Sequence, residues 1–273
     1  MTADKNILII ARKLALHDWQ VENTIRLLDG GATIPFISRY RKEMTGSLDE
    51  VQLMHIKEEY DRLKELDARR EAILKSIEEQ EKMTPELRAK IEAATTMAEL
   101  EDIYLPYRPK RRTRATIARE KGLEPLAELI FNQKENDPES KAEAFLNDQV
   151  ATVEEAVSGA SDIIAEWISE DDKARKQLRQ VFEKEAVIYS KVVKGKETEG
   201  IKYSDYFDWS EPLKKCPSHR LLAMRRGEDE GFLRLTIEPD EDHAIEILKS
   251  IFVRSNNASS DIVKDAVKDS WKR

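Results

Sequence analysis

The stretch "SLDEVQLMHIKEEYDRLKELDARREAILKSIEEQEKMTPEL", residues 47–87, contains no glycine and no proline before Pro85. Its apolar residues recur at intervals of three and four, which is typical of a helix with one buried stripe. The stripe consists of Ile56, Tyr60, Leu63, Leu66, Ile73 and Ile77. The pattern predicts one helix from residue 48 to about residue 80, roughly 45–50 Å long at 1.5 Å per residue. "SLDE", residues 47–50, has the residue types of a capping box and is expected to start this helix.

A helix of this length must bury its stripe against another element. Thr84 followed by Pro85 predicts the start of a second helix, which is expected to lie antiparallel along the first. A dimerising coiled coil is the alternative, because the stripe covers about three heptads. Asp67 and Arg70 interrupt those heptads, so the arrangement within one chain is favoured.

The composition favours the same fold class. Of the 273 residues, 37% are charged and 40% hydrophobic, and there are only nine glycines and nine prolines. This balance is typical of helices with solvated faces and not of a turn-rich β protein. The predicted fold is mostly α, an elongated multi-helix scaffold with one long helix, helix-turn-helix-like elements and a small β element near residues 187–239. We expect two domains, residues 1–131 and 132–273.

Further helix starts are indicated by hydroxyl residues that precede apolar runs, namely Thr33, Thr96, Thr152 and Ser218. From Val187 onward, β-branched and aromatic residues become frequent, and "FLRLTIEP", residues 232–239, alternates like a strand. Two or three short strands are expected there. The last helical pattern, which contains Trp271, stops without a glycine cap or a proline, and this suggests that a longer natural chain has been cut.

The segment "DIYLPYRPKRRTRATIAREKG", residues 102–122, is basic within an acidic chain. It has seven basic and two acidic residues, a net charge of +5, whereas the whole chain has a net charge of -8. Residues 121–170 contain three basic and twelve acidic residues, a net charge of -9. Two interpretations remain open. The arginines either contact the phosphates of a nucleic acid or pair with carboxylates of the chain itself, since a guanidinium group suits both.

The candidate nucleic-acid-binding residues are basic and lie in two segments. They are Arg108, Lys110, Arg111, Arg112 and Arg114, with Arg39, Arg41 and Lys42 as an extension. Pro106 and Pro109 fix the turn at the start of the first segment, and Tyr107 offers a ring on which an arginine or a base can stack. The following residues indicate helix, turn and helix, with Ala118 four residues before Gly122 as in many helix-turn-helix units.

Residues for catalysis or metal binding do not form a recognisable set. The four histidines are scattered, and Cys216 three residues before His219 supplies at most half of a zinc site. Ser218 beside His219 is better explained as a helix cap than as part of a catalytic triad. No strand-borne carboxylate cluster indicates a two-metal nuclease. We therefore expect a protein that is not an enzyme and has no cofactor.

The sequence also indicates the compartment. A single cysteine excludes an internal disulfide, and no apolar run approaches the ~20 residues that span a bilayer. The first residues, "MTADKNILIIARK", lack a cationic lead and a cleavage site of small residues. A cytoplasmic protein with no membrane partner is expected.

Three stretches resemble the bacterial Tex family of transcription accessory proteins. They are "IPFISRYRKEMTG" (residues 34–46), "DIYLPYRPKRRTRATIAREKGLEPLA" (residues 102–127) and "DYFDWSEPLKKCPSHRLLAMRRGEDEGFLRL" (residues 205–235). The resemblance implies a helical scaffold with helix-turn-helix-like elements that belongs to a nucleic-acid-binding protein. In the family this scaffold is followed by an RNase H-like domain, helix-hairpin-helix units and a C-terminal OB-fold RNA-binding domain. The chain resembles only the N-terminal scaffold and the central region.

Two functions are compatible with this resemblance. The first is a non-catalytic scaffold of a Tex-like accessory factor that meets RNA or DNA mainly through modules absent from this chain, with the transcription machinery as a further partner. The alternative is a protein–protein docking scaffold whose basic cluster forms intramolecular or inter-domain ion pairs. The two differ in how many of the guanidinium groups face carboxylates.

Overall fold

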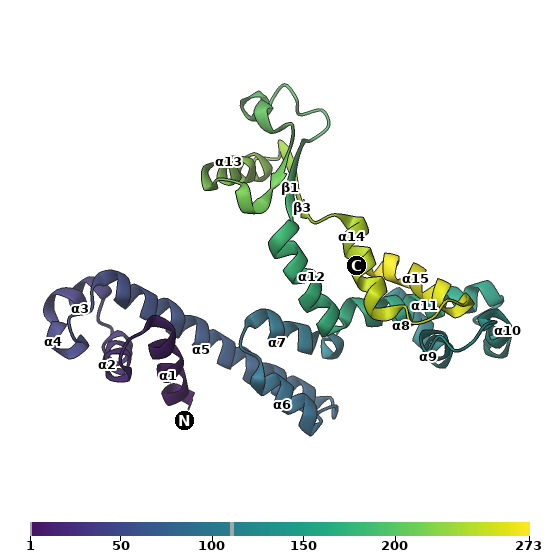
Figure 1. Cartoon of the computed structure of the whole chain (residues 1–273), viewed down its shortest axis with the longest axis horizontal. Helices are drawn as coiled ribbons and strands as arrows, with labels where there is room; N and C mark the ends of the chain where they lie inside the picture. Colours follow the sequence, from purple (N-terminus) through teal and green to yellow (C-terminus); the bar gives the residue numbers. More distant parts are fainter. Residues whose placement is uncertain (1, 110–111) are drawn as a thin grey trace. The chain divides into compact units, whose positions relative to one another are not determined.

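The computed structural model describes residues 2–109 and 112–273 of the chain. Contacts within the chain divide it into two compact units, Met1–Tyr104 and Leu105–Arg273. Each unit has a hydrophobic core of its own. The described residues are mostly α-helical with one small antiparallel sheet, which confirms the predicted fold class (Figure 1).

The first unit, drawn from purple to blue in Figure 1, is wholly helical in its described residues. Its helices are α1 (Thr2–Leu14), α2 (Asp18–Asp29), α3 (Ile34–Tyr40), α4 (Lys42–Thr45), α5 (Glu50–Glu79), α6 (Pro85–Ala93) and α7 (Met97–Tyr104). The predicted long helix is α5, which has 30 residues. Its ends lie close to the predicted ones.

The stripe of α5 faces the core of the first unit. Its buried residues are Leu53, Ile56, Leu63, Leu66, Ile73 and Ile77, which confirms most of the predicted stripe. Tyr60 is only half-buried and donates its hydroxyl proton to Asp29 over 3.0 Å. The helix packs against α1, α2 and α3, and also against α6 and α7. Several short helices therefore cover the stripe, and α6, the helix predicted after Thr84, is one of them.

The start of α5 differs from the predicted capping box at residues 47–50. Ser47 has a left-handed backbone with φ of 64°. Asp49 caps the helix, because its carboxylate accepts the backbone N–H of Gln52 at 2.8 Å, and the Gln52 side chain accepts the N–H of Asp49 at 3.1 Å. The predicted capping role of Ser47 was wrong. The caps predicted at Thr84 and Thr152 are confirmed, because both side chains accept a backbone N–H.

The second unit is built around α11 (Val153–Glu170). Its other helices are η1 (Leu105–Tyr107), α8 (Arg114–Glu120), α9 (Glu124–Phe131), α10 (Pro138–Ala142), η2 (Glu143–Phe145), α12 (Asp172–Glu185), η3 (Ile201–Tyr206), η4 (Leu213–Lys215), α13 (Ser218–Asp229), α14 (Glu241–Phe252) and α15 (Ala258–Trp271). The buried face of α11 packs against α8, α9 and α15. At Gly159 of α11 an added Cβ would lie 2.5 Å from Leu123 Cδ1, so the turn between α8 and α9 approaches α11 closely.

The small sheet lies between α12 and α14 in the chain. Its strands are β1 (Val187–Val192), β2 (Asp208–Pro212) and β3 (Leu233–Glu238), in the antiparallel order β2-β1-β3. Tyr189 in the central strand pairs with Ser210 on one side and Thr236 on the other. α13 packs against β3, as Figure 1 also shows. Ser218 is the first residue of α13, after Pro217 at the cap position, so its predicted role as the cap was wrong.

No helix in the described ranges combines the length and the apolar character that crossing a membrane requires.

Candidate nucleic-acid interface

The proline-fixed turn places Arg108 at the surface of the second unit. Arg108 donates its backbone N–H to the carbonyl oxygen of Leu105 at 3.4 Å, which closes the turn η1. Its exposed side chain lines a cavity of about 420 Å³, together with Thr113, Arg114 and Glu166. Within residues 2–109 and 112–273, Arg108 forms no ion pair. Lys110 and Arg111, the next predicted residues, lie outside the described part of the chain.

Arg114 belongs to a network of charges that joins three helices. Its Nε lies 3.2 Å from Asp162 of α11, and its Nη2 lies 3.0 Å from Asp269 of α15. Arg273 contacts the same two carboxylates at 2.7 and 2.6 Å. The network therefore has two guanidinium groups and two carboxylates, and it ties α8 to the helices that share its core.

Arg112 also has a partner within its own unit. Arg112 lies just before α8, and its Nη2 is 2.7 Å from Glu120, the last residue of that helix. Both side chains are more than half exposed, 69% for Arg112 and 52% for Glu120. An exposed pair of this kind stabilises a fold by about 0–1 kcal/mol, so its guanidinium can exchange the carboxylate for another anion.

The most buried charge pair of this segment was missed by the sequence reasoning. Arg119 donates from Nη1 to Glu166 at 2.5 Å and from Nε to Glu124 at 3.1 Å, and Thr113 donates its hydroxyl proton to Glu166 at 3.1 Å. The Glu166 side chain is only 5% exposed. Burial lowers the pKa of Arg119, but its hydrogen bonds to Glu166 and Glu124, together with the negative charges of both carboxylates, outweigh burial and leave that pKa above its ordinary value.

The partners of these basic residues come largely from the acidic segment at residues 121–170. Asp162 and Glu166 lie in it, and so does Glu155, which is 3.5 Å from Lys121. Arg112 and Arg114 thus pair with carboxylates of the chain itself, as the second interpretation of the basic segment expects. Contact of the candidate residues with phosphate stays a prediction.

The helix, turn and helix predicted after Thr113 are present. α8 and α9 are joined at Gly122, whose φ of 80° suits a glycine. The inner face of the pair packs against α11, and the charged residues of α9 are Glu124 and Glu128. Two carboxylates on the second helix would repel a phosphate backbone. The charges of α9 therefore do not support recognition of DNA by this helix, which stays a prediction.

A dependence of stability on pH follows from Asp269. Burial would raise its pKa, but hydrogen bonds from Arg273 and Arg114 hold the pKa below its ordinary value. A lowered pKa in the folded state stabilises the fold above the pKa of the unfolded chain, and the contribution is lost as the pH falls through the folded pKa. We expect this loss below about pH 4, where an unperturbed aspartate titrates.

The variant Asp269→Asn tests this expectation by thermal unfolding at a series of pH values. Its Tm should lie below that of the unchanged chain at pH 7, and the difference should shrink as the pH falls below about 4. Asp265→Asn is the control, because Asp265 pairs with Lys268 on the surface of the same helix at 3.0 Å. A difference for Asp269→Asn that stays constant with pH would contradict the expectation.

The second group of candidate residues lies in the first unit, where α3 meets α4. Arg39 and Lys42 are exposed, and Arg41 is half-buried. Arg41 donates to the carbonyl oxygen of Tyr40 at 2.8 Å, and its guanidinium carbon lies 5.1 Å from the centre of the Phe36 ring. In the part of the chain that the structure describes, none of the three cations forms an ion pair. Their charges are therefore not compensated by direct contact.

Two aromatic residues on α3 were not among the predicted site residues. Phe36 is 40% exposed and Tyr40 is 63% exposed, and their ring centres lie 5.4 Å apart. The buried residues of α3 are Ile37 and Ser38, which places the rings outside the core. Their spacing of four residues beside three cations, in "PFISRYRK", was the signal that could have found them.

The two groups of basic residues lie in different units. Arg39, Arg41 and Lys42 belong to Met1–Tyr104, whereas Arg108, Arg112 and Arg114 belong to Leu105–Arg273. A single electropositive face formed by both groups stays a prediction.

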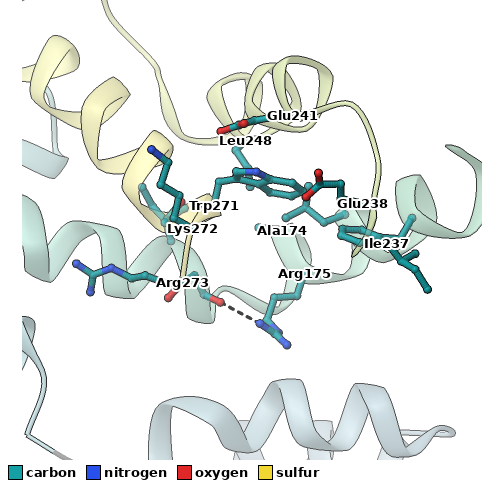
Figure 2. Close-up of a pocket in the computed structure, with 14 residues that line it drawn as sticks. Ala174, Arg175, Ile237, Glu238, Glu241, Leu248, Trp271, Lys272 and Arg273 are labelled. Carbon is teal, nitrogen blue, oxygen red and sulfur yellow. Dashed lines mark hydrogen bonds between the residues drawn. The ribbon is translucent and has the colours of Figure 1, made fainter. Parts of the chain in front are cut away.

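A larger cavity, of about 550 Å³, lies in the second unit beside the end of α15 (Figure 2). Leu248, Trp271 and Ile237 form part of its apolar wall, and Arg175 donates to the carbonyl oxygen of Ser169 at 3.3 Å, the dashed line in Figure 2. Charges of both signs line it, so it does not select an anion. Among the described residues, no three or more His, Cys, Asp or Glu side chains gather in a way that could hold a metal ion.

The described residues form a mostly helical protein with basic side chains exposed in each of its two units. Comparison with known proteins gives the family. A family model described as "Tex central region-like" matches residues 133–273, and one described as "Tex-like protein N-terminal domain" matches residues 4–78. The first match covers more than half of the chain, so the chain belongs to the Tex family. The expected domain boundary after residue 131 stays a prediction.

Relatives of the chain occur in bacteria and in animals. It is 47% identical over 235 residues to "Transcriptional accessory protein Tex" of Neisseria gonorrhoeae, covering 85% of the chain and 31% of that protein. It is 45% identical over 272 residues to "Protein YhgF" of Escherichia coli, covering 96% of the chain and 35% of that protein. It is 27% identical over 233 residues to human "S1 RNA-binding domain-containing protein 1", covering 81% and 23%. The chain spans about a third of the length of its bacterial relatives.

Proposed function

We propose that the chain is a non-catalytic scaffold of a Tex-like transcription accessory factor and that it contacts the phosphates of RNA or DNA through its unpaired cations. One observation supports this most directly. Arg39, Arg41, Lys42 and Arg108 form no ion pair within the described ranges, whereas carboxylates hold Arg112 and Arg114. An unpaired cation can take a phosphate without first losing a carboxylate, and the counterions released favour binding.

The names of the relatives support a nucleic acid as the partner. One is called a transcriptional accessory protein and another an S1 RNA-binding domain-containing protein, and both are much longer than this chain. In a protein of that length, the main contacts with nucleic acid would lie in modules beyond the matched region. The chain would add phosphate contacts and position those modules in the cytoplasm, with the transcription machinery as a further partner. We include Lys110 and Arg111 among the proposed phosphate contacts only because they lie between Arg108 and Arg112 in the sequence.

A protein–protein docking scaffold is the second candidate function. The contacts of Arg114 and Arg273 with Asp162 and Asp269 favour it, because they use part of the basic cluster to join helices. In that case the basic cluster stabilises the second unit or its docking to another protein, and the chain does not bind nucleic acid. The two functions differ most at Arg39, Arg41 and Lys42, whose charges have no partner in the first unit.

The triple variant Arg39→Ala/Arg41→Ala/Lys42→Ala tests the proposal. Fluorescently labelled RNA and duplex DNA are titrated at about 50–200 mM salt, where phosphate contacts determine the affinity. We expect weaker binding by the variant and a slope of log K against log salt that is smaller by about 2–3, since each lost phosphate contact removes about one unit.

Lys57→Ala/Arg62→Ala/Lys75→Ala is the matched control for that titration. It removes three positive charges from the same unit, but these cations already pair with Asp61, Glu59 and Glu79 along α5. We expect a smaller loss of affinity and of slope from the control. Equal losses from the two variants, or no salt-sensitive binding by the unchanged chain, would overturn the proposal.

A further inference from the structure

The surface formed by α3 and α4 combines exposed aromatic rings with uncompensated cations. Tyr40 is 63% exposed and Phe36 is 40% exposed, four residues apart on the same helix. Arg39, Arg41 and Lys42 are their neighbours in the sequence. We refer to these five residues as the α3–α4 surface. Tyrosine can stack on an aromatic ligand while nearby cations neutralise an anionic one.

The two rings have different surroundings. Arg41 lies over the Phe36 ring, 5.1 Å from its centre, so one face of Phe36 already stacks on a cation. Phe36 and Tyr40 meet at an interplanar angle of 43°, which leaves much of Tyr40 outside the contact. Neither ring belongs to the buried core cluster of the first unit. The residue of α3 that is buried in this cluster is Ile37. Tyr40 is therefore the ring with the most surface available for a ligand.

The backbone beneath this surface is held in place by the neighbouring helix. Gln20 of α2 donates to the carbonyl oxygen of Thr45 at 3.1 Å, and Asn23 donates to that of Met44 at 2.8 Å. These hydrogen bonds fix α4, and with it the backbone of Lys42, against α2. A preorganised surface loses less conformational entropy when it binds a ligand.

The charges around the rings are mostly positive. Residues 34–46 contain three basic residues and only one acidic residue, Glu43. Glu50 at the start of α5 is engaged, because its carboxylate accepts the hydroxyl proton of Ser38 at 3.1 Å. The local charge favours an anionic ligand, and the rings favour one that presents flat aromatic groups. A nucleic acid provides both.

We propose that the α3–α4 surface binds single-stranded nucleic acid, with a base stacked on Tyr40 and neighbouring phosphates on Arg39, Arg41 and Lys42. The inference rests on the proposed function and specifies its ligand. In a duplex the bases stack on each other and their faces are hidden, so a surface ring cannot reach them. In a single strand every base has a free face, and stacking needs no particular sequence.

The test uses the whole 273-residue chain and three labelled probes: a short oligo(U), an oligo(dT) of the same length and a mixed-sequence DNA duplex. Tyr40→Ala should weaken binding of the two single strands by about 5- to 100-fold, the range expected for loss of one stacked base. Binding of the duplex should change by less than about twofold. Tyr40→Phe should bind like the unchanged chain, because the ring is kept.

The salt dependence separates stacking from charge. Tyr40→Ala removes no charge, so its slope of log K against log salt should equal that of the unchanged chain, whereas the triple cation variant should lower the slope. Because Tyr40 is largely exposed, its replacement should leave the Tm unchanged. Losses of similar size with oligo(U) and oligo(dT) support base stacking in both.

The outcomes also separate this inference from the proposed function. If Tyr40→Ala binds single strands like the unchanged chain while the triple cation variant is weakened, the stacking role is overturned and phosphate contact stands. Equal weakening of single-strand and duplex binding by Tyr40→Ala would likewise overturn it. If neither variant differs from the unchanged chain, both proposals fail. If poly-glutamate binds more tightly than oligo(U), the surface belongs to an acidic protein partner and the inference is overturned.

Discussion

Replacing Glu166 by alanine is expected to lower the free energy of unfolding of the second unit by about 3 kcal/mol. Breaking a buried ion pair from one side costs about 3–5 kcal/mol, because the remaining charge stays away from water. Arg119 is that charge, with a side chain only 28% exposed, and Thr113 also loses an acceptor. The lower end of the range applies because Arg119 keeps its contact with Glu124 at 3.1 Å.

Urea unfolding followed by tryptophan fluorescence measures this change, since Trp167, Trp209 and Trp271 lie in the second unit. Arg112→Ala is the control, because it breaks an exposed pair with Glu120, which lies on the same helix as Arg119, and should cost less than about 1 kcal/mol. Glu166→Gln keeps an acceptor for Thr113 and should fall between the two. A cost for Glu166→Ala no larger than that of Arg112→Ala would show that the buried pair does not brace the unit.

Replacing Gly46 by alanine is expected to destabilise the first unit by about 2–5 kcal/mol. Gly46 has φ of 67°, a left-handed backbone that costs other residues about 1–2 kcal/mol. An added Cβ would also lie 2.7 Å from both Trp19 Cη2 and Gln20 Nε2. Overpacking of this kind costs about 1–3 kcal/mol. The same change would disturb the hydrogen bond from Gln20 that holds α4.

Gly31→Ala separates the two causes. Gly31 has φ of 84°, but no atom lies within 4 Å of an added Cβ. Its replacement should therefore cost only the backbone component, about 1–2 kcal/mol. Urea unfolding followed by circular dichroism compares the two variants. Equal costs would show that the approach of Trp19 to Gly46 does not determine the stability of this part of the unit.

The helices were largely predictable because their signals are local. The absence of glycine and proline and the spacing of six side chains were sufficient to predict α5. Its cap was not predicted, because Ser47 and Asp49 are both good capping residues and the choice depends on the left-handed backbone at Ser47. β2 gave little signal, since "DWSEP" has few strand-forming residues and is held in the sheet by pairing with β1.

The candidate site was predictable in its charges and not in its contacts. The excess of acidic residues at 121–170 indicated partners for the arginines, and Asp162 and Glu166 are such partners. Asp269 and Arg273 could not be assigned, because they reach Arg114 only through the packing of α15 on α11. Tyr40 was not predicted as a site residue. Which side of a short helix is exposed depends on which of its residues pack into the core, and in α3 these are Ile37 and Ser38.

Paired and unpaired cations of this chain are expected to have different roles. Thermal unfolding and RNA titration of Arg39→Ala/Arg41→Ala/Lys42→Ala and of Arg112→Ala/Arg114→Ala test it together. We expect the first variant to lose RNA affinity and salt slope with an unchanged Tm, and the second to have a lower Tm and to retain most of its affinity. The opposite result, with affinity lost mainly in Arg112→Ala/Arg114→Ala and an unchanged Tm, would contradict it.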